Sequence, residues 1–286
     1  MSCASAEAVA DASALLRTDH SPLEEFIRRH TPLFVLTGAG CSTESGIPDY
    51  RNAEGDWKRA RPILLETFLG DPLARRRYWA RSLPGWRRFR LARPNGAHRA
   101  LARLERAGCI ERLVTQNVDG LHQAAGSSDV IDLHGRLDRV RCIACGEALQ
   151  REDFQLELLR RNGAWSRVEA AEAPDGDADL DGPDFSRFEV PPCTCCGGVL
   201  KPDVVFFGER VPSERVEAAM HALERADAML VIGSSLMVYS GYRFAYAAAK
   251  AGKPIAAVNL GRTRADDLLT LKVEQPCAAA LASLLD

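Results

Sequence analysis

The sequence has no apolar run long enough to cross a lipid bilayer, and it has almost no net charge. None of its 286 residues belongs to an uninterrupted apolar stretch of about 18 residues, the length that a transmembrane helix requires. The formal net charge of −2 gives no general attraction to nucleic acid or to an anionic membrane surface. We therefore expect no membrane span and no nucleic-acid partner. The sequence does not define the oligomeric state, for which we favour a monomer.

The N-terminal segment lacks the basic residues that open a secretory signal, and it contains Glu7 and Asp11 instead. We predict that residues 1–20 form a mobile leader and that the protein is cytoplasmic. The chain is 46% hydrophobic, which is enough for one large domain or for a large domain with a small companion.

Two pairs of cysteines have the spacing of zinc knuckles. The chain has nine cysteines, and an odd number without a secretory signal argues against a disulfide framework. Cys142 and Cys145 form one C-x-x-C pair, and Cys193 and Cys196 form another, separated from it by 47 residues. Two such pairs can surround one Zn²⁺ and leave no position open for a substrate, so we predict a structural zinc. Buried free thiols are the alternative, and Cys195 could replace Cys193 or Cys196 as a ligand.

Short apolar segments alternate with helical patterns along most of the chain. We expect strands at 33–37, 112–115, 130–133, 204–207, 228–232 and 255–258, and helices from Pro22, over 96–107, near 214–225 and over 242–251. This alternation predicts an α/β fold, a Rossmann-like doubly wound parallel sheet covered on both faces.

The cysteine pairs interrupt the alternation, so we expect a small zinc-binding module inserted in the larger domain. The predicted boundaries are 21–135 and 203–286 for the Rossmann-like domain and 136–202 for the module. The acidic segment 169–184 is interpreted as a solvated loop without a function, and the arginine-rich segment 75–93 as a solvated helical surface.

The stretch GAGCSTESGIPDYRN, residues 38–52, begins like a dinucleotide-binding loop but departs from that pattern. Gly38-Ala39-Gly40 follows a buried strand, whereas the expected third glycine is Thr43. A dehydrogenase would also carry an acidic residue about 20 positions after the glycines, to hold the adenosine ribose. Here residues 57–62 read WKRARP, which counts against hydride transfer.

Further polar residues follow other predicted strands, where open α/β sheets bind ligands. These groups are Gln116-Asn117-Val118-Asp119, Gly233-Ser234-Ser235 and Asn259-Leu260-Gly261. Any one of them could be simple turn chemistry, but together they predict a dinucleotide crevice. His134 ends the strand 130–133 beside this crevice. It is either a general base or a structural residue.

In order along the chain, these motifs resemble the sirtuin family. The resemblance runs from about residue 21 to the C-terminus and includes 38–51, 115–119, His134-Gly135, the two cysteine pairs and 233–235. Blocks 201–209 and 238–244 are most similar to the class II branch, which includes the mitochondrial sirtuin 4 of animals.

The resemblance implies an NAD-dependent protein-lysine deacetylase or deacylase that cleaves NAD to nicotinamide and transfers the acyl group to ADP-ribose. His134 would act as the base on a ribose hydroxyl, and acylated-lysine proteins or peptides would be the partners. The residues implied for NAD binding are Gly38, Ala39, Gly40, Ser42, Thr43, Ile47, Pro48, Asp49, Tyr50, Arg51, Gln116, Asn117, Val118, Asp119, Gly233, Ser234, Ser235, Asn259, Leu260, Gly261 and Cys277.

Two questions stay open at this point, the reaction and the acyl group. The alternatives are an ADP-ribosyltransferase acting on protein and an NAD-binding sensor without turnover, and a sensor has no need for a base at His134. Tyr78 and Arg81 have the Tyr-x-x-Arg spacing that desuccinylating sirtuins use for acidic acyl groups. Because their surroundings are more similar to the class II pattern, we expect neutral acyl groups, acetyl included.

Overall fold

A computed structural model describes residues 21–58, 62–168, 171–172, 174–180 and 184–285. The predicted leader, 1–20, lies outside the described residues, as do residues 59–61 of the segment that argued against hydride transfer. No helix within the described part of the chain has the length and apolar character needed to cross a membrane.

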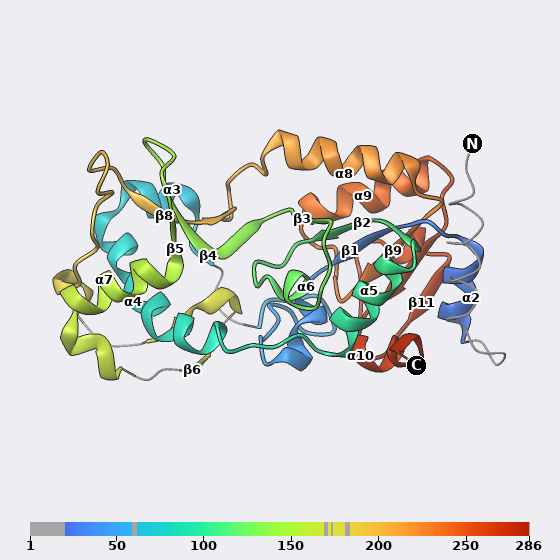
Figure 1. Cartoon of the computed structure of the whole chain (residues 1–286), viewed down its shortest axis with the longest axis horizontal. Helices are drawn as coiled ribbons and strands as arrows, with labels where there is room; N and C mark the ends of the chain where they lie inside the picture. Colours follow the sequence, from blue (N-terminus) through green and yellow to red (C-terminus); the bar gives the residue numbers. More distant parts are fainter. Residues whose placement is uncertain (1–20, 59–61, 169–170, 173, 181–183, 286) are drawn as a thin grey trace.

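The larger part of the protein is a six-stranded sheet in the order β11-β10-β9-β1-β2-β3, with every neighbouring pair parallel. Its strands are β1 (Leu33–Thr37), β2 (Ile110–Thr115), β3 (Val130–Asp132), β9 (Ala228–Ile232), β10 (Ile255–Val258) and β11 (Leu271–Val273). The predicted Rossmann-like α/β fold is therefore confirmed (Figure 1). β11 was not predicted, because its three residues are only partly buried and include Lys272.

Helices cover both faces of this sheet. One apolar cluster joins Leu33 and Val35 of β1 to α2 (Pro22–Arg29), α5 (Gly96–Arg106) and α10 (Cys277–Ala280). A second cluster joins Phe34 and Leu36 to α8 (Ser213–Arg225) and α9 (Tyr239–Lys250), which lie above the sheet in Figure 1. Successive residues of a strand point to opposite faces, and β1 is buried on both.

The predicted helix start at Pro22 is confirmed by its capping box. Glu24 N donates to Ser21 Oγ at 3.3 Å, and Ser21 N donates to Glu24 Oε2 at 2.8 Å, which satisfies backbone donors that the helix itself leaves unpaired. The helices predicted near 96, 214 and 242 are present as α5, α8 and α9. α9 begins three residues earlier than predicted.

A smaller module, drawn at the left of Figure 1, is built on a second sheet in the order β5-β4-β8. Its strands are β4 (Gly135–Cys142), β5 (Ala148–Gln150) and β8 (Leu200–Val204), and its helices are α3 (Leu65–Gly70), α4 (Pro72–Phe89) and α7 (Arg151–Arg161). The remaining elements are α6 (Leu121–Ala124), β6 (Ala171–Glu172), β7 (Ala178–Asp179) and 3-10 turns at Ala39–Cys41, Thr43–Ser45, Gly163–Arg167, Pro174–Gly176, Phe185–Arg187, Asp266–Leu268 and Ala282–Leu285.

The strand predicted at 204–207 is wrong in both position and sheet. The strand ends at Val204 and pairs antiparallel with β4 in the module. Beyond it, Phe206 N donates to the Glu209 carboxylate at 2.8 Å and Glu209 N donates to Phe206 O at 3.0 Å, so the chain turns instead of extending.

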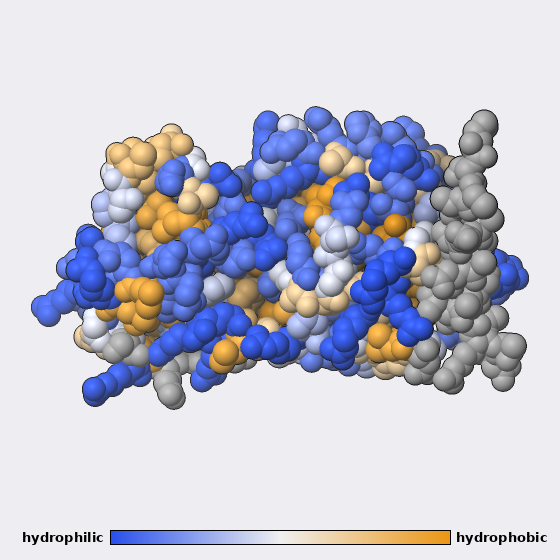
Figure 2. Space-filling model, viewed as in Figure 1, coloured by the Kyte–Doolittle hydropathy of each residue, from blue (hydrophilic) through white to orange (hydrophobic). Residues whose placement is uncertain are grey.

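Helix α4 contributes to the core of the module, although segment 75–93 was predicted to be a solvated surface. Trp79 and Leu83 pack in one apolar cluster with Phe154 and Leu200. The predicted boundaries assign α4 to the Rossmann-like domain, whereas its packing joins it to the module. Figure 2 shows that polar side chains cover most of the visible face and that apolar patches on it are separated.

The described residues of the acidic segment 169–184 form regular structure, in contrast to the predicted solvated loop. β6 and β7 pair antiparallel across a 3-10 turn, and Ala178 is buried. A Cβ placed on Gly85 of α4 would lie 2.1 Å from the Gly176 carbonyl oxygen, so this turn packs directly against the helix backbone. Residues 169–170, 173 and 181–183 lie outside the description.

Candidate active site

A pocket of about 1200 Å³ lies at the carboxyl ends of the parallel strands, between the sheet and the module. Small-molecule sites commonly have volumes of about 300–1,000 Å³, so this one has room for a dinucleotide and part of a second substrate. It brings together these predicted site residues: Gly38, Ala39, Gly40, Ser42, Ile47, Pro48, Asp49, Tyr50, Arg51, Gln116, Asn117, Val118, Asp119, His134, Gly233, Ser234, Ser235, Asn259 and Leu260.

Three predicted residues do not line the pocket. Thr43 is exposed, and its hydroxyl donates to Gly40 O at 3.1 Å. Gly261 has a φ of +82° and lies where a Cβ would be 2.3 Å from Ala53 O. Cys277 begins α10 and is buried in the apolar cluster on the α5 face of the sheet.

The glycines after β1 allow two loops at the sheet edge to touch. A Cβ on Gly38 would lie 2.7 Å from Ser234 Cβ, and one on Gly40 would lie 3.0 Å from Gly233 O. Gly40 N donates to Gly233 O at 2.8 Å. The Gly-Ala-Gly turn therefore packs on the loop after β9, and residues of both loops line the pocket.

The irregular segment after this turn is held by polar and aromatic contacts. Arg51 donates from Nη1 to Gly55 O at 2.7 Å, and its guanidinium lies 4.0 Å from the centre of the Trp57 ring. Tyr50 packs edge-on against the same ring, and Lys58 pairs with Asp49. These contacts fix 49–58 as one wall of the pocket instead of a helix.

A buried polar network joins the loops after β1 and β2. Asn117 Nδ2 donates to Gly38 O and to Ser42 Oγ, both at 3.0 Å. Ser42 Oγ donates in turn to Asp119 Oδ2 at 2.7 Å. Burial raises the pKa of the Asp119 carboxyl, although hydrogen bonds from Leu121 N and Ser42 partly oppose this.

His134 is held as a neutral imidazole in one tautomer. Its Nδ1 lies 2.9 Å from Gln116 O, and because a carbonyl oxygen only accepts, Nδ1 carries the proton. Its Nε2 therefore holds a lone pair, which accepts from Ser240 Oγ at 2.8 Å. Burial lowers the pKa of His134 to about 4. This arrangement is suited to a general base.

Sequence reasoning missed Ser240, the residue that contacts the Nε2 of His134. It lies in α9, 106 positions away, and lines the pocket. The block 238–244 was singled out for its family resemblance, and nothing in its local pattern indicated a contact with the histidine.

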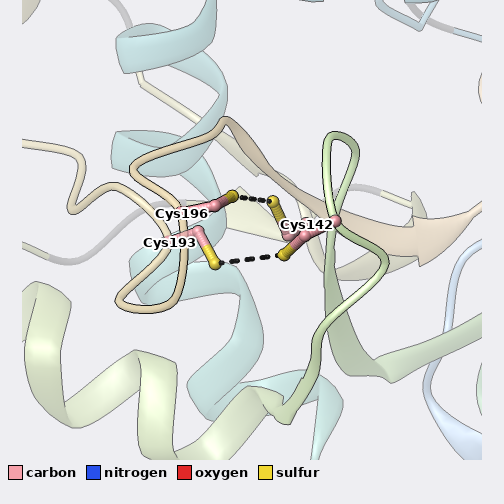
Figure 3. A group of neighbouring side chains, drawn as sticks. Cys142, Cys193 and Cys196 are labelled. Atoms are coloured by element: carbon pink, nitrogen blue, oxygen red, sulfur yellow. Dashed lines mark hydrogen bonds between the residues drawn. The ribbon is translucent and has the colours of Figure 1, made fainter.

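The four predicted zinc ligands lie together in the module, with their sulfurs facing one another (Figure 3). Cys142 Sγ is 3.5 Å from Cys196 Sγ, and Cys145 Sγ is 3.8 Å from Cys193 Sγ. Ligands 2.3 Å from a tetrahedral Zn²⁺ are about 3.8 Å apart, so the four thiols fit this ion. All four are free rather than disulfide-bonded.

Cys195 is exposed and is absent from this group of four. We predict that Cys195→Ser retains one Zn²⁺ per chain, because the remaining sulfurs already form a closed tetrahedral set. Metal content by elemental analysis of the purified variant checks this. Loss of the ion would show that Cys195, and not Cys193 or Cys196, is a ligand.

A Rossmann-like sheet with a dinucleotide-sized pocket at its carboxyl edge, joined to a four-thiolate module, defines a dinucleotide-binding protein with a structural metal site. Comparison with known families is more specific. The model of the Sir2 family matches residues 38–240, and the chain belongs to this family. The resemblance to sirtuins is confirmed.

Curated relatives cover nearly the whole chain. The chain is 66% identical over 262 residues to an NAD-dependent protein deacetylase of Xanthomonas campestris pv. campestris (strain 8004), which spans 92% of this chain and 89% of the relative. It is 64% identical to NAD-dependent protein deacetylase 2 of Bradyrhizobium diazoefficiens, over 92% of this chain and 96% of the relative.

Solved structures of Sir2 proteins share the fold. A Sir2 complex with a p53 peptide and NAD+ has a TM-score of 0.73 and 32% identity, covering 93% of this chain and 98% of that one. A Sir2 variant with a deacetylated p53 peptide and 3′-O-acetyl ADP ribose has the same TM-score of 0.73 and the same coverage.

Proposed function

We propose that this chain is an NAD-dependent protein-lysine deacetylase of the class II branch of the Sir2 family. The proposal rests mainly on the protonation state and position of His134. It is neutral, its tautomer is fixed by Gln116 O, and its Nε2 lone pair, which accepts from Ser240 Oγ, lies in a dinucleotide-sized pocket. The relatives named as NAD-dependent protein deacetylases support the same activity.

NAD supplies a ribose carbon that becomes electrophilic as nicotinamide leaves, and the residues of this chain position it. Gly38, Ala39 and Gly40 would present backbone groups to the pyrophosphate, and residues 47–51, which also line the pocket, would face the nicotinamide half. The network of Ser42, Asn117 and Asp119 orients the ribose and the carboxamide. Positioning is the main requirement, because an amide oxygen is a weak nucleophile.

Ser234, Ser235 and Asn259 hold the adenosine end of NAD in this proposal. Ser234 Oγ donates to Gln116 Oε1 at 2.6 Å, which ties the loop after β9 to the loop after β2. Thr43, Gly261 and Cys277 lie outside the pocket lining and are not assigned a direct contact.

The acylated peptide lies extended between residues 204–209 and the loop around 238–242, and residues 204–209 and 238–240 line the pocket. Val205 N donates to His134 O at 2.8 Å, so this segment leads directly to the base. Val238 and Tyr239 are exposed at 36% and 59%, which leaves their surface accessible to an extended peptide. The Sir2 complex with a p53 peptide and NAD+ supports a peptide substrate for this fold.

Release of nicotinamide with and without an acetyl-lysine peptide tests the proposed function. A deacetylase releases nicotinamide when the peptide is present and forms free lysine in equal amount. An ADP-ribosyltransferase releases it with an unacylated acceptor protein, and a sensor releases none. Either of the last two outcomes would replace the proposal.

The depressed pKa of His134 predicts an unusual pH profile. A histidine with an ordinary pKa of 6.5 would lose its base function as the pH falls below neutrality. Here the neutral form persists until the pH falls through about 4, so kcat/KM should stay level between about pH 8 and 5. Steady-state rates measured across this pH range test the prediction, and intrinsic fluorescence at each pH checks that the protein stays folded. A midpoint near 6.5, present with His134 and lost without it, would contradict the assignment.

Several sequence predictions remain part of the proposal. The class II placement is supported by blocks 201–209 and 238–244 alone. The boundaries of the inserted module at 135/136 and 202/203, with α4 packed onto it from outside that range, a cytoplasmic location and a monomer are likewise proposed.

A further inference from the structure

The pocket has an end that none of the roles above uses. It is lined by Tyr78, Arg81 and Phe89 of α4, by Leu137 of β4 and by Asp177 of the acidic segment. α4 and β6 lie at the left in Figure 1, away from β9 and α9, which border the NAD-binding part. Val118 and Leu137 are buried beside it, in one apolar cluster with Trp86.

A charged pair closes this end. Arg81 donates from Nε to Asp177 Oδ1 and from Nη2 to Asp177 Oδ2, both at 2.9 Å. This is the two-point geometry by which a guanidinium binds a carboxylate. The side chains are 18% and 35% exposed, so the pair is partly removed from water.

The protein backbone holds Asp177 in place. Asp177 Oδ1 also accepts from Ala178 N at 2.8 Å, and Ala178 is buried. The preceding Gly176 lies against the α4 backbone at Gly85, where a Cβ on Gly85 would be 2.1 Å from the Gly176 carbonyl oxygen. The carboxylate is therefore supplied to Arg81 by a short segment that is packed onto the same helix.

We propose that this end of the pocket receives the acyl chain and that Asp177 occupies the guanidinium N–H groups of Arg81 that would otherwise bind a carboxylate. The enzyme therefore accepts uncharged acyl chains and rejects those that end in a carboxylate. The inference rests on the proposed deacylase function. It assigns Asp177 as the residue that determines acyl specificity.

Electrostatics explain the discrimination. An acyl chain that ends in a carboxylate would meet Asp177 at the same guanidinium, and two like charges cannot both be satisfied there. Burial and, to a smaller extent, the nearby Asp177 charge raise the pKa of the Tyr78 hydroxyl, which indicates that this end of the pocket is partly dehydrated. An uncharged chain meets only the apolar walls and a neutralised pair.

Asp177→Asn tests the proposal with two substrates of one shape. Succinyl-lysine and its uncharged succinamoyl amide are compared in the same peptide with the zinc-loaded, full-length protein. Wild type should favour the amide. In Asp177→Asn the succinyl-to-amide ratio of kcat/KM should rise by about tenfold or more, because one charge-assisted pair becomes available to the substrate. The change should appear mainly in KM, since it concerns binding of a remote group.

Two controls separate this from a general effect of charge or folding. In the double variant Arg81→Met/Asp177→Asn, the succinyl-to-amide ratio of kcat/KM should not rise, because the guanidinium is missing. Asp184→Asn removes an exposed carboxylate of the same acidic segment that does not line the pocket, and should leave the ratio unchanged. In Asp177→Asn, the side-chain amide oxygen can still accept from Ala178 N, so the local fold should be kept. Asp177→Ser provides a second variant without the carboxylate.

Wild-type preference for succinyl-lysine over its amide would overturn the proposal, whatever the variants do. An unchanged ratio in folded Asp177→Asn, or a gain that persists without Arg81, would overturn it as well. Turnover of acetyl-lysine by the wild type reports on the proposed function separately, so the two failures are distinguishable.

Discussion

His134→Ala should lower acetyl-lysine turnover by about 10²–10⁴-fold, the usual contribution of a general base. Some exchange of labelled nicotinamide into NAD should remain when acyl-peptide is present. Departure of nicotinamide requires a positioned amide oxygen but no proton transfer. The later attack by a ribose hydroxyl does require a base. The structure places the Nε2 lone pair of His134 in the pocket, where it can take that proton.

The alternative for His134 is a purely structural role at the end of β3. In that case the variant should lose thermal stability and NAD binding, and both activities should fall together. His221→Ala is a matched control, because His221 is an exposed histidine on α8 that does not line the pocket. A folded His134→Ala enzyme that deacylates at nearly the native rate would remove His134 as the base.

Cys142→Ser should abolish zinc binding and unfold the module that carries α4, with a loss of more than about 4 kcal/mol of stability. Cys142 is itself buried in the module's apolar cluster with Trp79 and Phe154, so the metal site and the core are one unit. Removal of Zn²⁺ with a chelator should have the same effect on the wild type.

Elemental analysis and thermal unfolding measure this effect. One Zn²⁺ per chain is expected in wild type and in Cys195→Ser, and none in Cys142→Ser. Wild-type protein purified without chelator that contains no metal would contradict the assignment. A Cys142→Ser protein with unchanged stability would show that the ion does not support the fold.

Features that depend on neighbouring residues could be predicted from the sequence. Ser21 and Glu24 define a helix start because the capping box spans only four positions. The apolar run of β1 and the glycines that follow it define a strand and a tight turn at the sheet edge. The cysteine pairs have a metal-specific spacing that few other roles require.

Features that depend on distant contacts could not be predicted. Ser240 meets His134 only after α9 folds back onto the sheet edge. Asp177 meets Arg81 across 96 positions, and its acidic surroundings resemble an ordinary solvated loop. Cys277 was assigned to the pocket, but α10 turns its first residue into the core, where burial raises the pKa of the thiol to about 12.

The central claim, that this chain transfers the acyl group of lysine to ADP-ribose, is tested most directly by the product balance of one reaction. The wild type is incubated with NAD and an acetyl-lysine peptide, and all products are quantified by mass spectrometry. The account predicts one nicotinamide, one acetyl-ADP-ribose and one deacetylated peptide for each NAD consumed. Nicotinamide formed together with ADP-ribosylated protein and an intact acetyl-peptide, or no consumption of NAD, would contradict it.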